Sequence, residues 1–183
     1  DGQKNQKITW EHLLNQSSDW KGSLWGINDW EDRPNPKLNI DSWRSEAQKE
    51  PGTHYKYNDV RVNVLAYSLL NIYRKSLPKV LQQNIMDKIG ASDSWRWYGY
   101  ENSWVNIDGY MVQSVSGGGH NGGGVFINSE DHARFGLLYL NNGLWNGKRI
   151  ISEEWIKKSV TSSSTNPEYG YMWWINHEDG EDY

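Results

Sequence analysis

The side chains with the clearest chemical potential follow a Pro-Gly turn at residues 51–52. Tyr55 and Tyr57 alternate in the extended run after it, so both phenols are predicted to project to one face. Tyr57 also directly precedes a predicted helix, which would hold its phenol in a fixed place. A fixed phenol can give and take a proton, so Tyr57 is a candidate for proton transfer. The structural alternative is a packing tyrosine with its hydroxyl in water.

The helix that positions Tyr57 is predicted over residues 60–73. Asn58 and Asp59 are both favourable N-cap residues. Apolar side chains then recur at three- and four-residue steps, which predicts one buried face. The predicted face consists of Val62, Leu65, Leu69, Ile72 and Tyr73.

Other helices are predicted where a capping residue or a stop signal borders an apolar pattern. They are a helix over 10–16 capped by Thr9, one from Asp41 to Lys49, one over 76–89 ended by Gly90, one from Ser129 to Asn142, and one over 153–158 capped by Ser152.

Strands are predicted at residues 110–115 and at the aromatic run 169–176. Asn146-Gly147 is typical of a tight hairpin turn. Residues 91–108 show no clear period and are predicted to be an aromatic loop.

A run with six glycines in nine residues spans 116–124 and has His120 at its middle. Glycine permits backbone conformations closed to other residues and lets another group approach closely. A phosphate-binding loop is excluded because the Gly-Lys-Ser/Thr ending is missing and no strand–loop–helix order fits.

Four segments together resemble one family of serine hydrolases, that of class C β-lactamases, penicillin-binding proteins and 6-aminohexanoate-dimer hydrolases. Tyr57-Asn58-Asp59 is similar to its second motif (Tyr-x-Asn), with Asp59 in the third place instead of Asn. Further similar words, in family order, are Ile8-Thr9 with Leu13-Leu14, the stretch from Gly124 to Phe135, and Tyr169-Gly170-Tyr171 with Trp173-Trp174.

This resemblance implies an α+β, mainly helical fold: the central helical lobe and a few strands of the β-lactamase/transpeptidase-like fold. It implies hydrolysis of an amide or ester through an acyl-enzyme, with Tyr57 as proton relay and Asp59 as second catalytic residue. Trp20, Trp25, His120 and Gly123 are expected to bind the substrate, a small amide, ester or peptide-like molecule. The family also favours a bacterial periplasmic or secreted location.

The family's nucleophile motif, Ser-x-x-Lys, has no convincing counterpart here. Its place in the relatives is upstream of the Ile-Thr segment, and the third motif follows the Tyr-Gly-Tyr strand. Two matches, Ser18 to Lys21 and Ser76 to Lys79, are interpreted as chance because neither occupies the expected place. Residues 1–183 are therefore expected to form a single incomplete domain, the middle of the family's domain, which is inactive alone.

The composition of the chain disfavours several other classes of function. The net charge is −4 and no dense Lys/Arg run occurs, which disfavours nucleic acid and anionic membranes as partners. No apolar run is long enough to span a bilayer. There is no cysteine, and the five histidines lack metal-ligand spacing, so neither a metal nor another cofactor is expected. The oligomeric state is left open.

Two alternatives to a hydrolase stay open at this point. With 12 tryptophans, several of them in Gly- and Asn-rich loops, the chain could be a carbohydrate-binding module that stacks sugar rings. It could also be a catalytically inactive structural homologue.

Overall fold

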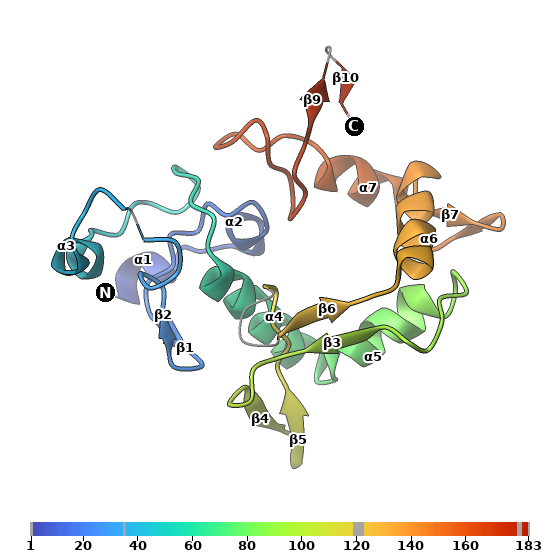
Figure 1. Cartoon of the computed structure of the whole chain (residues 1–183), viewed down its shortest axis with the longest axis horizontal. Coiled ribbons are helices and arrows are strands. Elements are labelled where there is room, and N and C mark those ends of the chain that lie inside the picture. Colours follow the sequence, from blue (N-terminus) through green and yellow to red (C-terminus); the bar gives the residue numbers. More distant parts are fainter. Residues whose placement is uncertain (1, 35, 119–122, 179–180, 183) are drawn as a thin grey trace. The chain divides into compact units, whose positions relative to one another are not determined.

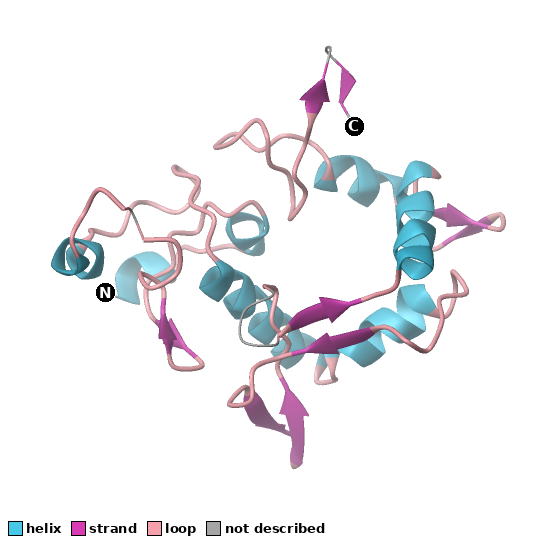
Figure 2. Cartoon of the chain, viewed as in Figure 1, coloured by secondary structure: helices cyan, strands magenta, loops and turns pink. Residues whose placement is uncertain are grey.

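The computed structural model describes residues 2–34, 36–118, 123–178 and 181–182. The chain divides into two compact units, one of residues 1–65 with 160–183 and the other of residues 66–159. Both contain short helices and two-stranded antiparallel pairs, with more helix than strand (Figures 1 and 2). The predicted α+β, mainly helical fold is confirmed.

The first unit begins with α1 (Gly2–Asn5) and α2 (Trp10–Leu14). As predicted, Thr9 caps α2: its hydroxyl accepts from the His12 N–H, and the His12 ring accepts from the Thr9 N–H. The Asn5 side-chain amide donates to the Lys21 carbonyl at 2.7 Å. These bonds fix the start of the described chain against the loop that follows α2.

That loop contains the hairpin of β1 (Ser23–Leu24) and β2 (Ile27–Asn28) and then α3 (Ile40–Ser45). Asn39, rather than Asp41, caps α3, because its side chain accepts from the Ser42 N–H at 2.9 Å. The predicted helix to Lys49 is too long, since α3 ends at Ser45.

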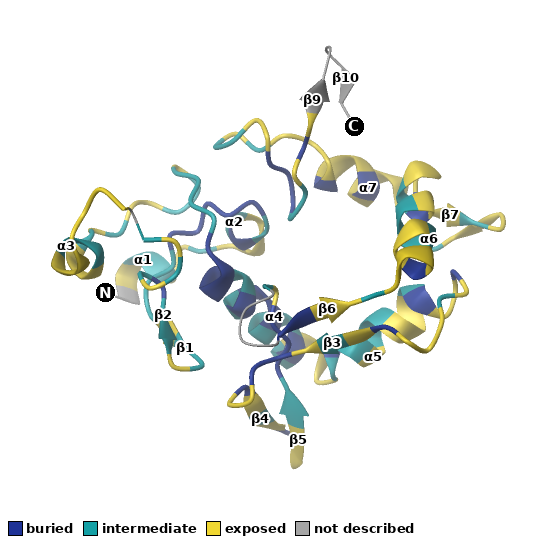
Figure 3. Cartoon of the chain, in the orientation of Figure 1, coloured by how far each residue is buried: buried dark blue, intermediate teal, exposed yellow. Residues whose placement is uncertain are grey.

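Helix α4 (Asp59–Tyr73) forms where it is predicted, but its buried side differs. Ile72 and Tyr73 are 63% and 54% exposed. Asn63, Ala66 and Leu70 are buried instead, at three- and four-residue steps. Figure 3 shows the start of α4 as buried. The hydrophobic pattern missed this stripe because it includes a polar residue.

The second unit is built around a core of Met86, Ile89, Trp95 and Leu138. Helix α5 (Leu77–Leu81) passes directly into a π-helical segment (Gln82–Met86), and Gly90 follows with φ +69°. The helix and its end at Gly90 therefore agree with the prediction. The change from α-helix to π-helix at Gln82 was not predictable from any pattern in the sequence.

Residues 91–108 are not the aperiodic loop that the sequence predicts. Strand β3 (Arg96–Tyr98) pairs with β6 (Gly124–Phe126), and β4 (Trp104–Ile107) pairs with β5 (Tyr110–Gln113), both antiparallel. The hairpin turn is Asp108-Gly109, with φ of +52° and +89°. An Asp-Gly pair is a strong hairpin signal, and the prediction overlooked it.

Helix α6 (Ser129–Leu140) is capped by Asn128, not Ser129, since the Asn128 side chain accepts from the Asp131 N–H at 2.8 Å. It ends two residues before the predicted Asn142. The predicted turn at Asn146-Gly147 joins β7 (Leu144–Trp145) to β8 (Lys148–Arg149), and Ser152 precedes α7 (Glu153–Ser159) as expected. Turn and capping residues thus predicted the helices and the hairpin turn of this region, but not the exact first and last residues of α6.

The aromatic run 169–176 is not a strand. It folds back in a turn at Met172 (φ +61°), so that only an isolated bridge joins Tyr169 to Trp174. The short strands β9 (His177–Glu178) and β10 (Glu181–Asp182) follow. The prediction failed because aromatic residues favour strands only where partner strands exist, and this run pairs with itself.

In the part of the chain that the structure describes, no helix combines the length and apolar character needed to cross a membrane. The same residues contain no group of three or more His, Asp or Glu side chains placed to hold a metal ion.

Candidate active site

Backbone and side-chain bonds on both sides of Tyr57 fix its position. The Lys56 N–H donates to the Gln16 carbonyl at 2.9 Å, and the Asn58 N–H donates to the Gln16 side chain at 3.1 Å. The Asn58 side chain caps α4 by accepting from the Arg61 N–H at 3.1 Å. Its amide also donates to the Asp29 carbonyl at 2.7 Å. The backbone on both sides of Tyr57 is therefore held in place by hydrogen bonds.

The Tyr57 ring belongs to a cluster of four aromatic side chains. It stacks on Trp174, with ring centres 5.6 Å apart and planes at 18°, and meets Tyr169 edge-on at 6.1 Å. Tyr55 contacts Tyr169 at 5.3 Å. The predicted alternation is confirmed, because both phenol rings reach the same buried neighbour. Tyr169 is 2% exposed, and its burial raises its pKa.

Two charged side chains flank the Tyr57 phenol. The Arg33 guanidinium carbon lies 4.4 Å from the ring centre, a cation–π contact. Asp59 is buried, and the negative charge of its carboxylate acts on the phenol. Arg33 and Asp59 face each other with 3.9 Å between Nη2 and Oδ2. The phenol thus lies beside one positive and one negative side chain.

The pKa of Tyr57 lies above the usual value of 10.0. Burial is the main cause, and the negative charge of Asp59 adds to it, while Arg33 acts in the opposite direction. Around neutral pH, Tyr57 is therefore a neutral phenol and a proton donor. To act as a base it needs a further cation beside it.

We expect Asp59→Asn to lower the pKa of Tyr57 and Arg33→Gln to raise it, because the first removes a negative charge and the second a positive one. NMR titration of ring-labelled tyrosine, with the Tyr57 signal assigned through Tyr57→Phe, measures both shifts. Shifts in the same direction would contradict this account of the site.

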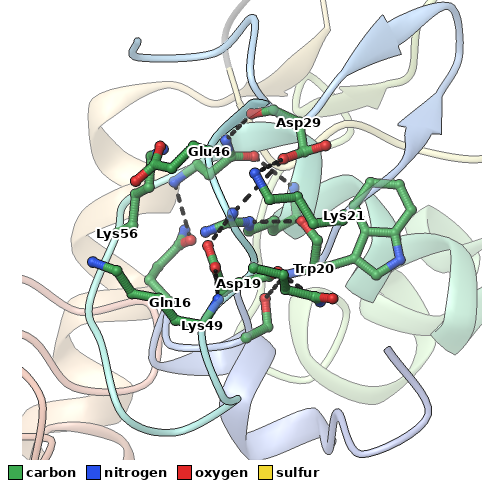
Figure 4. A network of polar contacts seen from close by, with 12 residues as sticks. Gln16, Asp19, Trp20, Lys21, Asp29, Glu46, Lys49 and Lys56 are labelled. Atoms are coloured by element: carbon green, nitrogen blue, oxygen red, sulfur yellow. Dashed lines mark hydrogen bonds and ion pairs between the residues drawn. The ribbon is translucent and has the colours of Figure 1, made fainter. Parts of the chain in front are cut away.

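A buried network of charged side chains connects the loop after α2 to α4, the helix that follows Tyr57. Arg61 is 1% exposed, its Nη2 lies 2.6 Å from Asp19 Oδ1, and its Nε donates to the Trp20 carbonyl at 3.3 Å. Lys21 pairs with Asp29 at 3.2 Å. Figure 4 shows Asp19, Lys21 and Asp29 pointing into one cluster.

Burial would raise the pKa of Asp19, but the Lys49 N–H and the charges of Arg61 and Lys21 outweigh it and hold that pKa below 3.8. Asp19 is therefore ionised in the folded protein. The network joins the loop after α2 to the first turn of α4, which carries Asp59.

Of the residues predicted to act in the site, Tyr57 and Asp59 both lie close to Arg33, and the charge of Asp59 acts on the Tyr57 phenol. Trp20 is half-buried with its ring against Gly22, and its carbonyl accepts a hydrogen bond from Arg61 of α4. Trp25 is half-buried in the β1–β2 turn, with φ +56°. For these two tryptophans, substrate binding stays a prediction.

His120 lies outside the described residues. Gly123 belongs to the unit of residues 66–159, where a side chain in its place would collide with Ser116, 2.7 Å away. Its role in substrate binding is likewise a prediction.

Sequence reasoning missed three neighbours of Tyr57: Arg33, Tyr169 and Trp174. Arg33 is an isolated cation in an irregular loop and has no motif of its own. Tyr169 and Trp174 were placed on a strand, whose alternation would have put them on opposite faces. The turn at Met172 brings both rings to Tyr57.

The model of the Beta-lactamase family matches residues 1–182. The chain belongs to the Beta-lactamase family. No curated protein sequence matches it.

Solved structures agree with this family in fold. A penicillin-binding protein from Bacillus halodurans is 17% identical, with a TM-score of 0.63, and the match covers 97% of this chain and 59% of that one. A candidate β-lactamase from Bacteroides dorei DSM 17855 is 16% identical (TM-score 0.66; 100% and 57% covered). A candidate 6-aminohexanoate-dimer hydrolase from Bacillus anthracis is 20% identical (TM-score 0.60; 94% and 48% covered).

This member of the Beta-lactamase family thus spans between about half and three fifths of the length of these structures. The resemblance of the Tyr57-Asn58-Asp59 segment and its neighbours to β-lactamases and penicillin-binding proteins is confirmed at the level of family and fold.

Proposed function

We propose that this chain supplies the tyrosine part of a serine-hydrolase active site that cleaves an amide or ester bond. The observation that carries the proposal is the Tyr57 phenol, which lies directly before α4, stacks on Trp174 and is flanked by the Arg33 guanidinium and the charge of Asp59. Membership of the Beta-lactamase family supports it. The substrate would be a small amide, ester or peptide-like molecule.

In the proposed reaction, Tyr57 as phenolate takes the proton of the serine hydroxyl while the serine oxygen attacks the substrate carbonyl. The phenol then gives this proton to the leaving amine or alkoxide as the bond to the carbonyl carbon breaks, which leaves an acyl-enzyme. Water, deprotonated by the same phenolate, attacks the ester and frees the acid and the serine. Tyr57 returns to its starting state after each half-reaction.

The raised pKa of Tyr57 sets a requirement for this mechanism. Because burial and Asp59 favour the neutral phenol, a cation must lie near it to stabilise the phenolate. Arg33 contributes part of this effect. The amine of a Ser-x-x-Lys motif would contribute the rest, as the family resemblance implies.

Neither Ser-x-x-Lys match within these residues fits that role. Ser18 is fully buried and accepts a hydrogen bond from the Trp20 N–H, and Lys21 is paired with Asp29. Ser76 precedes α5 and lies in the other unit from Tyr57. We therefore propose that residues 1–183 are one part of the catalytic domain and that another part contributes the serine and the amine.

We expect no serine adduct when the 183-residue chain is treated with a fluorophosphonate probe, because neither Ser18 nor Ser76, the serines of the two Ser-x-x-Lys matches, fits the role of nucleophile. Intact-mass spectrometry, followed by peptide mapping, measures this. Ser18→Ala and Ser76→Ala are the matched variants that would locate an adduct. Labelling at either serine would place the nucleophile inside these residues and refute the divided site.

A further inference from the structure

A pocket of about 490 Å³ opens in the unit of residues 66–159, and no residue assigned to catalysis above lines it. Its volume lies within the range of about 300–1,000 Å³ that is common for small-molecule sites. Four aromatic side chains contribute to its wall: Trp97, Tyr98, Trp104 and Tyr110.

One side of this pocket is rigid and the other is open. Trp97 is fixed by its indole N–H, which donates to the Ser116 carbonyl at 2.7 Å, and it packs against the unit's core. Trp104 and Tyr110 lie on the β4–β5 hairpin and are 51% and 76% exposed. Figure 3 shows the exposed residues of this hairpin. Large aromatic side chains gathered at an exposed concave surface are typical of a binding site.

Two polar residues of the pocket, Ser76 and Lys79, lie at the start of α5. Ser76 and Lys79 are three residues apart and therefore on one side of the turn. Among the described residues, neither side chain has a hydrogen-bond or ion-pair partner, and Ser76 makes no capping bond. The Gln113 amide, by contrast, accepts from the Gly99 N–H and donates to the Tyr100 carbonyl.

Among the residues that the structure describes, Lys79 is the only charged one that lines the pocket. A ligand that matches this lining has a planar apolar body and one negative charge at its end. We propose that the pocket binds an aromatic carboxylate, with its ring against Trp104 and its carboxylate on Lys79 and Ser76.

Two other roles fit the lining less well. A sugar is neutral, so it would leave the charge of Lys79 without an opposite charge in the ligand. A catalytic Ser-Lys pair needs a desolvated or otherwise activated amine, and Lys79 is exposed. The chance match to Ser-x-x-Lys is therefore interpreted as a carboxylate-binding pair.

Isothermal titration calorimetry of the 183-residue protein with 2-naphthoate, and with the neutral 2-naphthamide, tests the proposal. We expect naphthoate to bind one site, and naphthamide to bind it about tenfold more weakly, since it lacks the charge-assisted bond. Lys79→Gln should weaken naphthoate about tenfold and leave naphthamide unchanged. Trp104→Ala should weaken both about tenfold.

Lys88→Gln is the matched control, because Lys88 is also an exposed lysine of this unit but does not line the pocket. Circular dichroism checks that each variant is folded, and Lys79→Gln keeps the test valid should Trp104→Ala unfold. Equal affinity for the acid and the amide, or equal effects of Lys79→Gln and Lys88→Gln, would overturn the proposal. Trp104-dependent binding of an oligosaccharide with no binding of naphthoate would overturn it in favour of a sugar site.

Discussion

Arg61→Met should lower the free energy of unfolding by about 3–5 kcal/mol, because it removes one partner from a buried charge network. Arg61 is the cation closest to Asp19, at 2.6 Å, and it also lies 4.0 Å from Asp29. Methionine fills much of the same space, so the expected loss comes from the charge. Urea unfolding followed by tryptophan fluorescence measures it.

Lys7→Met is the matched control, since it removes a cation from a pair with Glu50 that is well exposed. It should change the free energy of unfolding far less than Arg61→Met, because water already screens that pair. Adding Asp19→Asn to Arg61→Met should restore part of the stability by removing the uncompensated acid. If both single variants unfold at the same urea concentration, the network does not hold the start of α4.

Tyr57→Phe should have the largest effect on activity. In a hydrolase that combines these residues with the proposed serine and amine, we expect kcat to fall by a factor of about 10²–10⁴, the usual contribution of a positioned acid–base group. The ring contacts with Trp174 and Tyr169 would remain, so KM and stability should change little. Steady-state kinetics on an ester and on an amide substrate measure the two parameters.

Tyr55→Phe is the internal control for this experiment. Tyr55 lies two residues away and packs on the same Tyr169, so its variant loses a phenol hydroxyl from the same aromatic cluster. Its kcat should stay within about a factor of two of the unchanged enzyme. Equal losses in both variants would show that the hydroxyl at Tyr57 has no special role in proton transfer.

Much of the fold was predictable because its causes are local. Thr9 caps α2 and Asn146-Gly147 turns the β7–β8 hairpin through interactions within a few residues. The same holds for the strand alternation that sends Tyr55 and Tyr57 to one face. Where two neighbouring residues could each cap a helix, as at Asn128 and Ser129, the sequence predicted the helix but not which residue caps it.

Contacts between distant parts of the chain were not predictable in this way. Hydrophobic periodicity placed Ile72 and Tyr73 in the buried face of α4, although both are exposed. The buried residues include Arg61, whose charge is compensated by Asp19 from a loop 42 residues earlier. Burial of a polar residue depends on a partner, and the partner is chosen by tertiary structure.

By itself, the sequence determined the family and the position of Tyr57-Asn58-Asp59 at the start of an apolar helix, because motif and cap are read from adjacent residues. Only the tertiary structure decided what surrounds the phenol. Trp174 reaches Tyr57 through a turn at Met172, and Arg33 reaches it from an irregular loop. The state of a proton depends on nearby charges and on burial, and both are set by residues far away along the chain.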